Sequence, residues 1–125
     1  MPRRIRITVG DVALEGELDD SATAGAVWEA LPLEARGHRW GDEVYFAIPV
    51  HRALEGPGQV VMEVGDLAYW PPGRAFCLFF GPTPASAGRE PRAASAVARI
   101  GRVTGDATAL ARVPDGAPVR VERAQ

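Results

Sequence analysis

Residues 65–84 read GDLAYWPPGRAFCLFFGPTP, and this segment decides how the fold is interpreted. It holds the only cysteine of the chain, four prolines and a cluster of aromatic residues. Pro71-Pro72-Gly73 is typical of a turn, so it separates a strand over 67–70 from a second strand over 75–80. The second strand is apolar on both faces. Because a single core covers only one face of a sheet, a loop, a partner chain or a ligand must cover the other.

Residues 4–18 give the clearest local signal, because apolar and polar side chains alternate on either side of Gly10-Asp11. This alternation predicts two half-buried strands, and glycine at the first turn position predicts a two-residue type II′ turn. Counting outward from the turn gives four cross-strand pairs: Val9 with Val12, Ile7 with Leu14, Arg6 with Glu15, and Arg4 with Glu17. The register matches apolar with apolar and positive with negative side chains, which are two independent arguments for one hairpin.

The remaining segments predict short strands joined by turns. We expect a helix over 21–31 capped by Asp20 or Ser21, a strand over 43–48 after a turn at Gly41-Asp42, and a further hairpin joining 59–64 to 67–70. A surface loop over 82–95, a strand over 96–103, a short helix over 107–112 capped by Thr104 or Asp106, and a last strand with Val119 and Val121 inward complete the chain. Together they favour a single, mainly β domain over 1–125, with about eight strands and two short helices in a closed antiparallel barrel or sandwich.

Composition excludes several classes of function. The net charge is −2, which gives no electrostatic reason to expect nucleic acid or an anionic membrane as a partner. A single cysteine leaves no internal disulfide and no multi-cysteine metal site. The two histidines stand in no carboxylate pattern typical of metal ligands, so we expect neither a metal nor a cofactor. No apolar run is long enough to span a membrane, and the N-terminus enters a strand pattern at once, which predicts a cytoplasmic protein without a signal peptide.

Three segments together resemble a known family: WGDEVYFAIPV (40–50), GDLAYWPPGRAFCLFFGPTP (65–84) and ASAVARIGRVTGD (94–106). They are similar to the small bacterial and archaeal cyclophilin-like proteins of unknown function, the family designated DUF369. The resemblance runs nearly from end to end and implies an eight-stranded antiparallel barrel closed by helices. It implies no established reaction.

More distantly, GRAFCLFF, IGRVTGD and YFAIP resemble strands of the cyclophilins, which are peptidyl-prolyl isomerases. Cyclophilins use an arginine to disfavour the planar amide, whose rotation otherwise costs about 18–20 kcal/mol. In the simplest gapless match that arginine falls at Ala47, the neighbouring glutamine at Ala75 and the pocket phenylalanine at Cys77. We therefore do not expect an efficient isomerase with the usual residues, although Arg52 or Arg74 entering the groove from elsewhere leaves a redesigned isomerase open.

The resemblance also assigns the two faces of the central strands. In cyclophilins the groove lies on the outer wall of the barrel, and here that wall would carry Glu43, Tyr45, Ala47, Ala75, Cys77 and Phe79. The opposite set would point into the barrel: Val44, Phe46, Ile48, Phe76, Leu78 and Phe80. The alternation of residues 43–48 predicts the same two faces independently.

The candidate ligand-binding residues are Glu43, Tyr45, Trp70, Arg74, Cys77 and Phe79. Glu43 can serve as an anion in the groove or be solvated, Tyr45 can donate to a ligand or be half-buried, and Trp70 can form a ligand wall or pack on its turn. Arg74 can bind an anion or extend along the surface. Cys77 is favoured as a small buried hydrophobe over a reactive thiol, because apolar neighbours raise a thiol pKa.

Three functions remain open at this point. The first is a binding module that holds an unidentified small molecule or extended peptide in a groove on the outer barrel wall. The second is a peptidyl-prolyl isomerase with a redesigned site. The third is a structural protein that buries its second apolar face in a homodimer.

Overall fold

The computed structural model describes residues 3–124 as ten strands, one α-helix and two 3₁₀ helices. In chain order these are β1 (Arg3–Val9), β2 (Val12–Leu18), α1 (Ala22–Ala30), β3 (Leu33–Arg36), β4 (His38–Arg39), β5 (Glu43–Ala47), β6 (Gln59–Val61), β7 (Asp66–Trp70), η1 (Pro71–Gly73), β8 (Ala75–Phe79), β9 (Arg92–Val103), η2 (Ala107–Arg112) and β10 (Pro118–Arg123). The prediction of a mainly β protein is confirmed.

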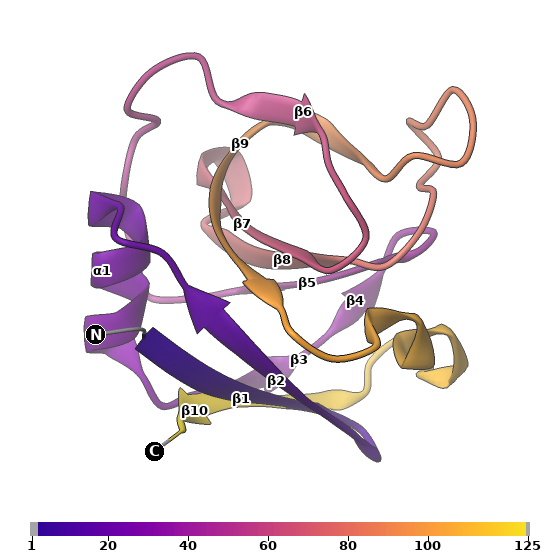
Figure 1. The fold of residues 1–125 in the computed structure, drawn as a ribbon, viewed down its shortest axis with the longest axis horizontal. Helices are drawn as coiled ribbons and strands as arrows, with labels where there is room; N and C mark the ends of the chain where they lie inside the picture. Colours follow the sequence, from indigo (N-terminus) through magenta and orange to yellow (C-terminus); the bar gives the residue numbers. More distant parts are fainter. Residues whose placement is uncertain (1–2, 125) are drawn as a thin grey trace.

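The strands form one antiparallel sheet in the order β3-β10-β1-β2-β9-β7-β8-β5-β4, with β6 paired to β9 off this path. Figure 1 shows β9 (orange) as a long curved strand that runs from β6 down to β2. The sheet curves, but its end strands β3 and β4 are not hydrogen-bonded to each other, so the predicted closed barrel is not confirmed. Only Gly37 separates these two strands, and an antiparallel pair requires a longer turn.

The N-terminal hairpin has the predicted register. Val9 lies opposite Val12, Ile7 opposite Leu14, Arg6 opposite Glu15, and Arg4 opposite Glu17. Gly10 has a φ of 59°, and Arg74 is the only described non-glycine residue with positive φ, so the turn has the positive then negative φ of type II′. β10 pairs with β1 and buries the two valines predicted to point inward.

The helices begin where the sequence predicts. The Ser21 hydroxyl accepts a hydrogen bond from the Ala24 amide at 3.1 Å, which caps α1. Asp106 caps η2 by accepting from the Thr108 amide at 3.0 Å. Both elements are therefore fixed by local capping chemistry.

The predicted hairpin between 59–64 and 67–70 is wrong, because β6 pairs with β9. β7 has no free edge for β6, since β8 occupies one side of it and β9 the other. The structure differs from the sequence-based prediction at two further places. β3 was not predicted, and the segment predicted as a loop to residue 95 already becomes strand at Arg92.

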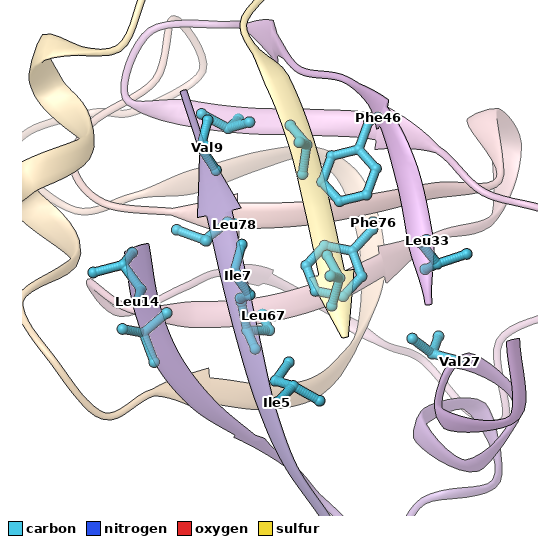
Figure 2. Close-up of a cluster of buried hydrophobic side chains, with 14 of the residues drawn as sticks. Ile5, Ile7, Val9, Leu14, Val27, Leu33, Phe46, Leu67, Phe76 and Leu78 are labelled. Atoms are coloured by element: carbon cyan, nitrogen blue, oxygen red, sulfur yellow. The ribbon is translucent and has the colours of Figure 1, made fainter. Parts of the chain in front are cut away.

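Two separate cores flank the central strands. The main core lies on the inner face, where Phe46 and Phe76 stack with ring centroids 5.1 Å apart (Figure 2). It includes the whole set predicted to point inward: Val44, Phe46, Ile48, Phe76, Leu78 and Phe80. The outer face carries a second, smaller core formed by Met62, Ala68, Ala75, Cys77, Phe79, Ala93 and Val97. The chain therefore covers its own second apolar face, with residues from β9 and from the segment that follows β6.

Candidate functional site

A cavity of about 240 Å³ opens beside the second core, on the outer face of β5 and β8. Three aromatic side chains line it: Trp40 just before the turn into β5, Tyr45 on β5, and Trp70 at the end of β7. The rest of the lining consists of Glu43, Cys77 and a group of small aliphatic residues from β9, namely Ala93, Ala94 and Val97. We call this cavity the outer-wall pocket.

Strand pairing brings the polar and aromatic groups of the outer-wall pocket together. The turn at Gly41-Asp42 makes Glu43 the first residue of β5, and Tyr45 follows on the same face. In the β5–β8 ladder Glu43 lies opposite Phe79 and Tyr45 lies opposite Cys77. Side chains on one face of neighbouring strands are within contact distance of each other. The carboxyl, the phenol and the thiol thus share one small patch of sheet.

Trp70 is held in place by its turn and by β9. Its indole Nε1 donates to the Ser95 hydroxyl at 2.7 Å. A Cβ at Gly73 would approach the Trp70 ring to 2.7 Å, so glycine at this position leaves room for the ring over η1. This wall of the outer-wall pocket is therefore fixed by contacts at both ends.

Glu43 is the electrostatic centre of the outer-wall pocket. The residue is only 6% exposed, and none of the ion pairs formed within residues 3–124 includes it. Burial raises the pKa of the Glu43 carboxyl from 4.5 to about 7, while a hydrogen bond with the Cys77 thiol acts in the opposite direction. The carboxyl therefore changes its ionisation near neutral pH.

Cys77 is 2% exposed, and burial raises the pKa of its thiol well above the ordinary value, with the nearby Glu43 charge adding to the effect. It therefore remains a neutral thiol at neutral pH, and the structure supports its interpretation as a small buried side chain.

Comparison with known proteins gives the family. A family model described as cyclophilin-like matches residues 3–122. The chain belongs to the cyclophilin-like family. It is also similar to a hypothetical protein of Archaeoglobus fulgidus, whose solution structure is 43% identical in sequence and matches with a TM-score of 0.83 over 98% of this chain and 95% of that chain. A search of curated proteins found no match.

In this cyclophilin-like protein four of the six candidate residues line the outer-wall pocket: Glu43, Tyr45, Trp70 and Cys77. Phe79 is fully buried in the second core, and it supports the outer-wall pocket without lining it. Arg74 is exposed and lies in a separate surface depression with His51 and Arg52. Whether any of the six binds a ligand remains a prediction.

Sequence reasoning missed several lining residues. Trp40 is not among the predicted ligand-binding residues, although an aromatic residue beside the predicted groove strand is a usable signal. Ala93 and Ala94 were missed because they fall in the predicted surface loop over 82–95, and Val97 because nothing in the predicted strand over 96–103 indicates which element it faces.

Within residues 3–124, no three His, Cys, Asp or Glu side chains gather as metal ligands would. None of the helices in that same range is long and apolar enough to cross a membrane. The cytoplasmic location remains a prediction.

Proposed function

We propose that this cyclophilin-like protein is a binding module that holds a small molecule in the outer-wall pocket. The single observation that carries the proposal is Glu43, a buried carboxyl that faces an aromatic cavity and has no cationic partner in the described chain. Burying such a group without compensation is costly, and a ligand would supply the missing partner. An apolar cavity with few polar groups is also the usual composition of a ligand site.

The size of the outer-wall pocket favours a small molecule over an extended peptide. Its volume is about 240 Å³, which is below the roughly 300–1,000 Å³ typical of sites for drug-sized ligands. By liquid volume it is equivalent to about eight water molecules. A compact ligand with one small ring fits this space, whereas a peptide would place at most one side chain in it.

The other two candidate functions have less support. Ala47 and Ala75 lie opposite each other in the β5–β8 ladder, at the positions where cyclophilins place an arginine and a glutamine in the gapless match, and a methyl group cannot donate a hydrogen bond. A proline-peptide assay at high protein concentration tests the isomerase directly.

A homodimer would be needed to cover Cys77 and Phe79 only if a single chain left them exposed, and a single chain already buries both residues. Light scattering tests the oligomeric state.

Ligand-detected NMR with a library of small fragments tests the binding proposal. We expect hits that shift the signals of Trp40 and Trp70, which line the outer-wall pocket, and leave Trp28 unchanged, because Trp28 packs against Arg123 elsewhere. Ala94 is exposed at the pocket, so Ala94→Phe fills the cavity from outside and is expected to abolish these hits. Ala13→Phe, at an exposed position on β2, is the matched control. No pocket-specific hit, or unchanged binding in Ala94→Phe, would overturn the proposal.

A further inference from the structure

We infer that the ligand of the outer-wall pocket is a small organic cation, a protonated amine on a compact apolar body, with Glu43 as its counterion. This inference rests on the proposed function and names the chemical class of its ligand.

The hydrogen-bonding capacity of the outer-wall pocket favours a donor. An ionised carboxylate only accepts hydrogen bonds, and a protonated amine only donates them. Glu43 is the only acidic side chain among the described lining residues, and none of those residues carries a positive charge. An anionic ligand would therefore meet a buried carboxylate with no cation to offset the repulsion, whereas a cationic ligand would complete an ion pair.

The aromatic lining favours the same class of ligand. The faces of tryptophan and tyrosine rings attract cations, and the attraction strengthens when water is excluded. Trp40, Tyr45 and Trp70 all line the cavity that contains Glu43. A neutral apolar ligand would also pack on these rings, but it would lack the cation–π attraction and would leave the carboxyl without a cationic partner. The combination of rings and carboxyl therefore points to a cation.

The outer-wall pocket also couples binding to pH. The titratable side chains in its lining are Glu43 and Tyr45 from β5 and Cys77 from β8, while β7 contributes Trp70 and β9 only aliphatic residues. His38 of β4 stacks on Tyr45, with ring centroids 5.3 Å apart. With the pKa of Glu43 near 7, the ionised fraction of its carboxyl rises about tenfold between pH 6 and pH 8. The affinity for a cation that requires the carboxylate rises by the same factor.

Three probes of nearly equal size test the inference: benzylamine as cation, benzyl alcohol as neutral donor and benzoate as anion. NMR titration near pH 8 is expected to show benzylamine binding at least about tenfold more tightly than benzyl alcohol, because both donate a hydrogen bond to the carboxylate but only the amine also forms an ion pair with it. Glu43→Gln is expected to lose this preference while still binding benzyl alcohol, and Glu29→Gln, an exposed carboxyl on α1, is expected to keep it. A short blocked peptide with a central lysine, run in parallel, distinguishes a free amine from a protein side chain as the source of the cation.

A second measurement uses the unaltered protein. Benzylamine is expected to lower the NMR titration midpoint of the Glu43 carboxyl by about one pH unit or more, and benzyl alcohol is expected to lower it by much less, because a neutral hydroxyl donates a hydrogen bond but lacks the opposite charge that favours the ionised form. An unmoved midpoint with bound benzylamine overturns the inference.

The two proposals fail in different ways. Benzyl alcohol or benzoate binding as tightly as benzylamine, or an amine preference that survives in Glu43→Gln, overturns the cation inference. In both cases pocket-specific binding that Ala94→Phe blocks still supports the binding module. If none of the three probes shifts the signals of Trp40 or Trp70 while other fragments of the library do, the cation inference alone is overturned. If no fragment of the library shifts these signals either, both proposals are overturned.

Discussion

Replacing Glu43 by glutamine exchanges a buried ionisable group for a neutral amide of nearly the same size, and the effect on stability is expected to depend on pH. In the unfolded chain the carboxyl has a pKa near 4.5, and folding raises it to about 7. Below the unfolded value both states hold the proton, so the carboxyl adds no penalty. As the pH rises from 4.5 to 7, the unfolded chain ionises first and the native state loses stability relative to it. Above the folded value the loss is complete.

The size of this loss follows from the two pKa values. The difference between 4.5 and about 7 is 2.5 pH units, and each unit corresponds to about 1.36 kcal/mol. The full loss is therefore about 3 kcal/mol, and the part that falls between pH 5 and pH 8 is about 2.5 kcal/mol. Glutamine does not titrate, so the stability of Glu43→Gln does not fall with pH in this way. Relative to the natural protein, the variant is expected to gain about 2.5 kcal/mol when the pH is raised across this range, or roughly 10 °C in Tm for a chain of 125 residues.

Urea unfolding followed by tryptophan fluorescence, near pH 5 and near pH 8, measures this double difference. All other titrating groups are common to both proteins and cancel. Glu29→Gln is the control, because Glu29 is exposed on α1 and its substitution is expected to have the same effect at both pH values. The reasoning is refuted if the stability difference between Glu43→Gln and the natural protein is the same at the two pH values, or if Glu29→Gln shows an equal pH dependence.

Two substitutions and one measurement of thiol reactivity test the packing of the protein. Gly101→Ala would place its Cβ inside the backbone of β2, so we expect urea unfolding to show a loss of stability above about 3 kcal/mol. In the control, Gly105→Ala, the new Cβ meets nothing within 4 Å, and the stability is expected to stay within about 1 kcal/mol of that of the natural protein. Equal losses of stability in the two variants would contradict the close approach of β2 and β9. Arg99→Met leaves the buried Asp66 carboxylate without the guanidinium that lies 2.8 Å away, and a loss of about 1–3 kcal/mol is expected, so a loss near zero would contradict this role. Cys77 is 2% exposed, so Ellman's reagent is expected to react with it far more slowly in the folded than in the denatured protein, and rapid reaction would show that the thiol is accessible.

Local patterns predicted the parts of the fold that depend on neighbouring residues. The β1–β2 register follows from a two-residue turn and from side chains that match in kind across it. The caps of α1 and η2 follow from Ser21 and Asp106, which lie directly before the helices that they cap. The inner and outer faces of β5 and β8 follow from alternation once one face is assigned to the core.

The pairing of β6 and the cover of the second core were not predictable in this way. Which strand pairs with β6 depends on which edges are already occupied by segments far away in the sequence. Residues 92–95 of β9, which precede the predicted strand over 96–103, read RAAS and show no apolar–polar alternation, so nothing local marks them as a strand. Arg74 has a φ of 49° at the end of η1, a backbone conformation that few non-glycine residues adopt, and it lines a separate depression. No local pattern of side chains predicts either feature.

The outer-wall pocket remains open because the residues that cover the second apolar face are small. Met62, Ala93 and Val97 bury Phe79 completely and Cys77 almost completely, but alanines on β9 leave space above Glu43 and Tyr45. A larger residue at Ala94 would fill this space, and a neutral residue at position 43 would remove the cost of a buried carboxyl. Both changes favour a more stable protein, since filling cavities and neutralising buried charges are common routes to stability. A cavity and a buried carboxyl without a cationic partner at the same place both lower stability, and their combination is the observation on which the proposed binding function rests.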